Sequence, residues 1–169
     1  MSDPPPDNPI YTLGHSNVPL EAVVALLRRF GVTRLVDART APYSKYSPQF
    51  NHEPLSRSLP EDIVYLYLGH ALGGKPPADG AHAPPDYEEL AARPAFQQGL
   101  EELRALQRAH VACLLCAEED PRKCHRSRLL GAKLLAWHGV DVQHLRHDGR
   151  VEPQSALEAE ENQQPRLFG

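Results

Sequence analysis

The chain has 169 residues, 41% of them apolar, which is enough for one domain with a hydrophobic core. Its net charge of -4 resides in the two ends, because residues 9–149 balance sixteen basic against sixteen acidic side chains, and this body lacks the field that would attract nucleic acid non-specifically. No apolar stretch approaches the ~20 residues that span a bilayer, and the first residues lack the charged and apolar regions of a signal peptide, so we expect a cytoplasmic protein with no membrane partner.

The first part of the chain predicts a βαβ unit. Residues 10–13 form an apolar run that predicts a strand, which ends in the polar turn 14–17. Apolar side chains at helical spacing then predict a helix that begins behind Pro19 and ends at Gly31. A second strand is expected over 32–38, and such crossovers are nearly always right-handed with parallel strands.

The rest of the chain continues this alternation. Its patterns predict, in order, a loop at 42–48, a short helix near 52–58, a strand at 63–68, a turn at 69–74, a proline-rich loop at 75–85, a helix behind Pro94, a strand at 111–116, a helix at 124–138 and a strand at 140–145. Five strands with intervening helices predict a three-layer, Rossmann-like α/β sandwich with a mostly parallel sheet. We expect one domain over 9–149, between a flexible proline-rich head at 1–8 and a disordered polar tail at 150–169.

Polar or glycine-bearing turns follow four of the predicted strands, at 14–17, 37–39, 69–74 and 116–126. The last of these holds two thiols, three carboxylates and four basic groups between an apolar strand and a helix. The carboxyl ends of parallel strands gather at one rim of the sheet, which is where open α/β sheets bind ligands. We therefore expect a single composite site at this rim.

These turns and strands resemble those of a known protein family. The motifs that carry the resemblance are Tyr11-Thr12-Leu13-Gly14-His15-Ser16-Asn17, Val36-Asp37-Ala38-Arg39, Pro42, Phe50-Asn51, Leu72-Gly73-Gly74, Cys116-Ala117-Glu118 and Cys124-His125-Arg126. Together they resemble the DUF488 family from about residue 9 to residue 147, with a departure at Ala38, where the family usually has valine. The resemblance implies the α/β fold and no particular activity, because the chemistry of this uncharacterised family is not established.

Three cysteines, an odd number, argue against a disulfide framework and leave reduced thiols, ligands or a redox pair. Cys113, inside a predicted strand, is interpreted as a small core residue. Cys116 lies next to a predicted helix amino terminus and is a candidate nucleophile, with His15 or His125 as its base. The carboxylates that follow Cys116 oppose both a thiolate and an oxyanion-binding loop, so we interpret the C-x5-R spacing to Arg122 as accidental.

A second interpretation is a metal site. Thiolate and imidazole suit zinc, and Cys116, Cys124 and His125 supply them, with His15 or His70 as a further ligand. The C-x7-C-H spacing is not usual for zinc and no second C-x2-C pair exists. We therefore assign no metal ligand and leave the cofactor open.

A third interpretation makes the carboxylates primary. Glu118, Asp120 or Asp37 would act as a general acid or base. Arginine suits phosphate, so Arg39 and Arg126, together with His15, would orient an anionic or nucleotide-like ligand. The competing interpretation of Asp37 and Arg39 is a salt bridge at the rim.

These patterns favour an enzyme, a hydrolase or a cysteine-dependent enzyme, that acts on a small polar or nucleotide-like substrate at the rim. The expected catalytic residues are His15, Asp37, Cys116 and Glu118. The expected substrate-binding residues are Gly14, Ser16, Asn17, Arg39, Cys124, His125 and Arg126. The competing class is a non-catalytic ligand-binding or adaptor protein.

The tail ends in a short motif through which such an adaptor would bind its partner. Gln164, Leu167 and Phe168 form Q-x-x-L-F, which resembles the peptide that bacterial repair and replication proteins insert into the sliding clamp. Two adjacent apolar anchors and a glutamine amide suit a groove. The motif predicts clamp binding and, through it, a link to DNA repair.

Overall fold

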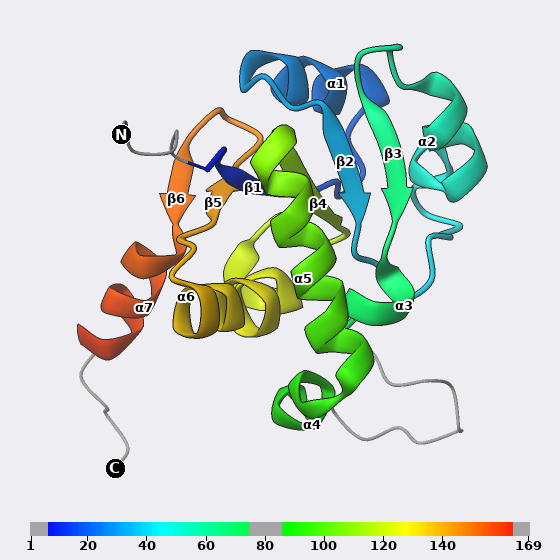
Figure 1. The fold of residues 1–169 in the computed structure, drawn as a ribbon. Coiled ribbons are helices and arrows are strands. Elements are labelled where there is room, and N and C mark those ends of the chain that lie inside the picture. The colour runs from blue at the N-terminus through cyan, green and yellow to red at the C-terminus, as the bar shows by residue number, and fades with distance from the viewer. Residues whose placement is uncertain (1–6, 75–85, 164–169) are drawn as a thin grey trace, which may run out of the picture.

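The computed structural model of the chain describes residues 7–74 and 86–163. It is an α/β sandwich around a six-stranded sheet of order β3-β2-β4-β1-β5-β6, which confirms the expected fold class (Figure 1). The strands are β1 (Ile10–Gly14), β2 (Arg34–Asp37), β3 (Val64–Tyr67), β4 (Ala112–Cys116), β5 (Gln143–Leu145) and β6 (Val151–Pro153). The pairs among β1 to β5 are parallel, and only β6 among the described strands runs antiparallel to its neighbour.

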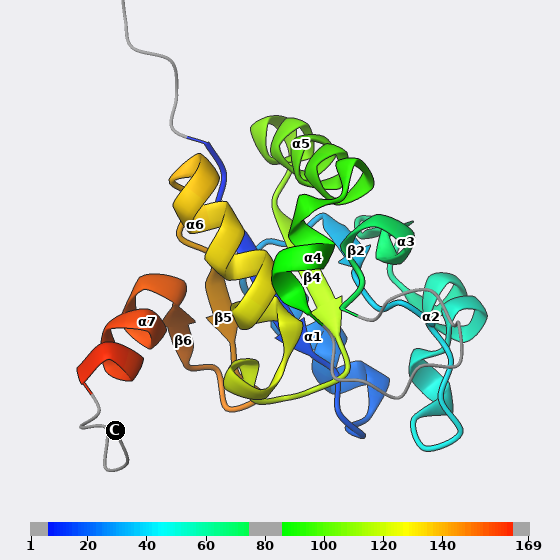
Figure 2. The same ribbon diagram turned by 90° about the horizontal axis from the view of Figure 1, so that it is seen from below.

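Helices cover both faces of the sheet, as the view in Figure 2 shows. They are α1 (Leu20–Arg29), α2 (His52–Ser58), α3 (Gly69–Leu72), α4 (Tyr87–Ala92), α5 (Pro94–Ala109), α6 (Ala132–His138) and α7 (Gln154–Gln163). Short 3₁₀ turns at Pro48–Phe50 and Pro121–Lys123 and a π-helix at Arg126–Gly131 complete the described elements. No helix in the described part of the chain combines the length and the apolar character needed to cross a bilayer.

The two faces of the sheet bury two separate cores because alternate side chains of each strand point in opposite directions. One core joins β4 to helices α4, α5 and α6 through residues such as Leu114, Leu103 and Leu134. The other joins the same strand to α1 and α2 through residues such as Leu115 and Leu27. Strand β4, which lies between the two cores, is buried along its whole length, and this explains why the run 112–116 is apolar throughout.

The carboxyl-terminal part departs from expectation. Residues 151–163 are ordered, so the prediction of a disordered tail over 150–169 is wrong for this segment. Strand β6 pairs with β5 through backbone bonds, and α7 buries Gln154 and Leu157 against the domain. The polar composition of residues 151–163 gave no sequence signal for a strand or a helix, because a short edge strand needs only backbone partners and α7 needs few apolar contacts. The motif residues Gln164, Leu167 and Phe168 lie outside the described residues, as do the head 1–6 and the loop 75–85.

Candidate functional site

The expected site residues lie at the carboxyl ends of β1, β2 and β4, which are neighbours in the sheet. The sheet nevertheless divides them into two groups on opposite faces. Arg39 and His15 both contact Phe50, which belongs to the core below α1 and α2. Cys116 and Cys124 belong to the core below α4, α5 and α6. The rim therefore carries two adjacent arrangements rather than one.

The first arrangement is centred on a buried ion pair. Arg39 Nε and Nη2 donate to the two carboxylate oxygens of Asp37 at 2.9 and 2.8 Å, and neither side chain is more than 7% exposed. Tyr65 also donates to Asp37, and a second Nη2 bond reaches the Phe50 carbonyl at 2.7 Å. A pair held in this way is a fixed part of the fold, because removal of either partner would leave a buried charge uncompensated.

His15 is locked into the same arrangement. Its Nδ1–H donates to the Ser16 carbonyl at 2.6 Å, its Nε2 accepts from Arg39 Nη1 at 3.1 Å, and its ring stacks on Phe50 at 4.6 Å. Burial lowers the pKa of His15 to about 4, so the ring is neutral at pH 7. Both ring nitrogens are engaged, which makes His15 a positioning group for Arg39 rather than a free base.

A cavity of about 290 Å³ opens beside His15 and Arg39. Its lining consists of His15, Ser16, Asn17, Arg39, Ala41, Tyr43, Ser44, Ser47, Ala117 and Glu118. Ser16 adopts a left-handed backbone conformation with φ of 49°, which is uncommon for a residue other than glycine and is seen often at ligand sites. The cavity thus combines hydroxyl, amide and carboxylate groups with the 73% exposed ring of Tyr43.

Glu118 is the one ionised lining residue whose charge is left uncompensated. Within residues 7–74 and 86–163 its exposed carboxylate has no hydrogen-bond or ion-pair partner, whereas Arg39 is neutralised by Asp37. The cavity therefore favours a neutral polar ligand over the anionic ligand expected from the arginines. The lack of a side chain at Gly14 lets the Glu118 backbone pack against the end of β1, since a Cβ at this position would lie 1.5 Å from the Glu118 carbonyl oxygen.

The second arrangement gathers Cys116, Cys124 and His125. The loop 117–123 turns back so that Cys124 Sγ lies 3.6 Å from His125 Nδ1, while Cys116 Sγ lies 3.9 Å from the same nitrogen. His125 Nε2–H donates to the Ala38 carbonyl at 3.1 Å, which leaves Nδ1 to face the sulfur atoms. Cys124 Sγ also accepts the backbone N–H of Arg126, at the start of the π-helix.

The two thiols differ in their acidity. Burial raises the pKa of Cys116 well above its ordinary value. The neighbouring Cys116 thiol and His125 hold the pKa of Cys124 far below its ordinary value. The pair therefore carries one proton, on Cys116, and the thiolate is at Cys124 rather than at the residue favoured from the sequence. His15 meets Cys116 only through its backbone N–H, so His125 is the imidazole beside the thiols.

The same three residues have ligand atoms within 4.8 Å of one another, as a metal site requires. A metal ion on His125 Nδ1 would lie along the lone pair of that nitrogen, pointing away from Nε2, and a bound sulfur would then be much nearer to Nδ1 than to Nε2. Cys116 Sγ is instead about equally far from both, at 3.9 and 3.8 Å. The geometry is that of a thiol beside an imidazole ring, and it does not fit a zinc ligand set.

Arg126 has a structural task. Its fully buried guanidinium donates to Thr12 Oγ1 at 3.1 Å and to the carbonyls of Glu118 and Glu119 at 2.7 and 2.8 Å, while its Nε has no partner in the described part of the chain. It therefore fastens the loop that carries Glu118 rather than lining the cavity. From Thr12 the hydrogen bonds continue to His144, a contact that the sequence pattern did not single out.

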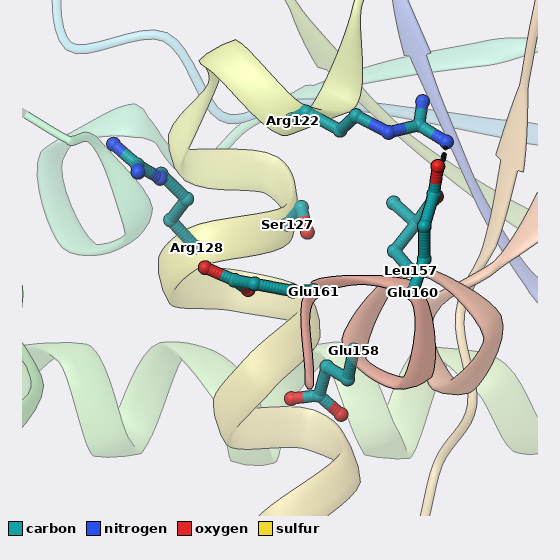
Figure 3. Close-up of a pocket in the computed structure, with 7 residues that line it drawn as sticks. All are labelled: Arg122, Ser127, Arg128, Leu157, Glu158, Glu160 and Glu161. Atoms are coloured by element: carbon teal, nitrogen blue, oxygen red, sulfur yellow. Dashed lines mark hydrogen bonds and ion pairs between the residues drawn. The ribbon is translucent and has the colours of Figure 1, made fainter. Parts of the chain in front are cut away.

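A second cavity, of about 200 Å³, lies between the π-helix and α7 (Figure 3). Among its charged lining residues, Arg122 pairs with Glu160 at 2.7 Å. Arg122 also pairs with Glu152, and Arg146 joins Glu152 to Glu119. This network attaches β6 and α7 to the loop after β4, and the cavity contains none of the expected site residues.

Comparison with known proteins gives one match. A family model described as a domain of unknown function, DUF488, matches residues 19–132. No curated protein and no solved structure matches the chain.

Proposed function

Since the chain belongs to the DUF488 family, a family defined by a domain of unknown function, we propose its activity from the cavity itself: it is an enzyme that hydrolyses a small, uncharged polar substrate of the nucleoside type. The observation that carries the proposal is the uncompensated Glu118 carboxylate in a cavity whose opposite side is fixed by Arg39 and His15. A cavity volume of about 290 Å³ suits a ligand of this size, near the lower end of the ~300–1,000 Å³ typical of ligand pockets.

Three of the lining residues have a role in this reaction. Glu118 acts as the general base that takes a proton from the attacking water and returns it to the leaving group. Arg39 has five N–H donors, of which the bonds to Asp37, His15 and Phe50 engage four, so one Nη1–H remains for a substrate oxygen. The exposed ring of Tyr43 offers a face on which a heterocycle can stack.

The test pairs binding with turnover. Nucleosides should raise the melting temperature of the protein more than the corresponding monophosphates do, because Glu118 repels the phosphate. Glu118→Gln should keep nucleoside binding and lower turnover by about 10²–10⁴-fold, whereas Glu102→Gln, an exposed carboxylate on α5, should leave both unchanged. Equal turnover by Glu118→Gln and the unaltered protein would refute the role of this carboxylate.

A second proposal concerns recruitment. We propose that Gln164, Leu167 and Phe168 bind a bacterial sliding clamp and so bring the domain to sites of DNA repair. It is supported by the motif itself, which combines a glutamine amide with two adjacent apolar anchors. Three free cysteines likewise support a reducing, cytoplasmic setting. A calorimetric titration of the full chain with the clamp should show binding that is lost when Leu167 and Phe168 are both replaced by alanine, and equal binding by that variant would refute the proposal.

A further inference from the structure

We propose that Cys124 and Cys116 form a redox pair that reduces hydroperoxides and closes reversibly into a disulfide. The pair lies on the face of the sheet opposite the Glu118 cavity, so this activity is independent of the hydrolysis proposed above. Two features carry it: the proximity of the two sulfur atoms and the groups that hold a thiolate at Cys124.

Proximity comes from the path of the loop after β4. Asp120 caps the 3₁₀ turn Pro121–Lys123 through the Arg122 N–H at 3.0 Å, and this turn brings the chain back to the end of the strand it left. The sulfur atoms of Cys116 and Cys124 consequently lie within 4.8 Å of each other. Formation of a disulfide would bring the two sulfur atoms from this separation to about 2.05 Å.

The thiolate of Cys124 is held by groups that donate to it. His125 presents Nδ1 at 3.6 Å, and its ring cannot turn freely because Nε2–H is bound to the Ala38 carbonyl and because Gly74 lies against the ring. The backbone N–H of Arg126 donates to the same sulfur at 3.5 Å. A nucleophile, a base and a group that orients the base are thus present in order, as in other cysteine sites.

Within residues 7–74 and 86–163, the further titratable groups that interact with the pair include Tyr87 from α4, Arg126 from the π-helix, Asp37 at the end of β2 and His144 from β5. The exposed fraction of Cys124 is 5% and that of Cys116 is 1%, so the order of reaction is set by access. Cys124 meets the oxidant first, and Cys116 follows as the resolving thiol.

The chemistry balances in two steps. The Cys124 thiolate attacks the outer oxygen of a hydroperoxide, the O–O bond breaks, and the alkoxide leaves as an alcohol after taking a proton from the solvent, which leaves a sulfenic acid on Cys124. The Cys116 sulfur then attacks the Cys124 sulfur, its proton goes to the departing hydroxide, and water leaves as the disulfide forms. A thiol reductant restores both thiols. The small exposed fraction of Cys124 restricts the oxidant to one of about the size of water, such as hydrogen peroxide.

The experiment uses hydrogen peroxide on the reduced full chain, with quenching and peptide mapping by mass spectrometry. The expected product is a Cys116–Cys124 disulfide that dithiothreitol reverses. Cys116→Ser should stop at a sulfenic acid that dimedone traps on residue 124, and Cys124→Ser should form neither product. Cys113→Ala is the matched control, since Cys113 lies on the same strand but in the other core, and it should form the disulfide as before.

The pH dependence of the first step supplies a second measurement that needs no variant. The thiolate fraction of an ordinary thiol falls about 100-fold between pH 7 and pH 5, and the oxidation rate of the same chain unfolded in urea should fall equally. The oxidation rate of the folded chain should fall less than about threefold over this range. Oxidation without a Cys116–Cys124 disulfide, or a folded rate that falls about 100-fold like the unfolded one, would overturn the proposal. Unchanged hydrolysis in the cysteine variants would show that the two sites are separate.

Discussion

Acid should destabilise the protein through the buried histidine at position 144, and the hydrogen bonds fix the direction of the effect. Gln154 Oε1 accepts a bond, so His144 Nε2–H donates to it at 2.7 Å, and His144 Nδ1 accepts from the Thr12 hydroxyl at 2.6 Å. Thr12 in turn accepts from Arg126. A proton on Nδ1 would remove the Thr12 bond and place a second positive charge near a buried guanidinium.

The magnitude follows from the pKa of this ring. Burial lowers the pKa of His144 from 6.5 to about 4, so between these values the unfolded chain binds a proton that the folded chain does not. Stability is therefore complete above pH 6.5 and decreases as the pH falls toward 4. The difference corresponds to about 3 kcal/mol of unfolding free energy, most of it lost by pH 4.5. His15, whose pKa is also lowered to about 4, contributes in the same direction.

Urea denaturation of the unaltered protein and of His144→Gln at pH 7, 6, 5 and 4.5 measures this contribution. The variant is less stable at pH 7, but its unfolding free energy should fall by about 2–2.5 kcal/mol less across the series, because glutamine does not titrate. His70→Gln, at an exposed position, should show the full decrease. Parallel curves for His144→Gln and the unaltered protein would refute the argument that burial of this ring determines the acid sensitivity.

Two further substitutions test the arrangement around the cavity. Gly14→Ala should lower the unfolding free energy by about 1–3 kcal/mol, because the new Cβ would displace the Glu118 carbonyl, and a denaturation curve like that of the unaltered protein would show that the loop yields freely. Tyr65→Phe should lower the unfolding free energy by about 1–2 kcal/mol in the same assay, since Asp37 loses one buried donor and keeps Arg39. Tyr46→Phe, at an 85% exposed ring, should leave the unfolding free energy unchanged. Equal losses for the two variants would contradict the buried hydrogen bond.

Much of the fold was predictable because its signals are local. The helix expected between Pro19 and Gly31 is α1, and the glycine lies where the chain turns with φ of 70°. The apolar run after residue 111 is the buried central strand β4. The family resemblance agrees with the family model, which matches residues 19–132. The sequence signals for β6 and α7 were weak, because both elements are held in place by residues that are polar or distant along the chain.

The candidate site was only partly predictable. The sequence places reactive side chains at strand ends and so predicts a rim, but it does not show which hydrogen-bond partners each one finds. Tyr65 and Phe50, which hold Asp37 and Arg39, lie on other elements of the chain. A signal for Tyr65 existed in the alternation of β3, which directs it and Leu66 to opposite faces, yet nothing local says that its hydroxyl reaches a carboxylate.

By itself, the sequence determined the alternation of strands and helices, the parallel sheet and the collection of polar residues at one rim, because periodicity, caps and strand polarity act over a few residues. Only the tertiary structure decided that the rim is two sites. The two-residue period of the strands sends Asp37 to one face of the sheet and Cys116 to the other, and the loop after β4 returns Cys124 to Cys116. Burial then made His15 neutral, and the neighbouring Cys116 and His125 placed the thiolate at Cys124, since the cost of a buried charge depends on every group around it.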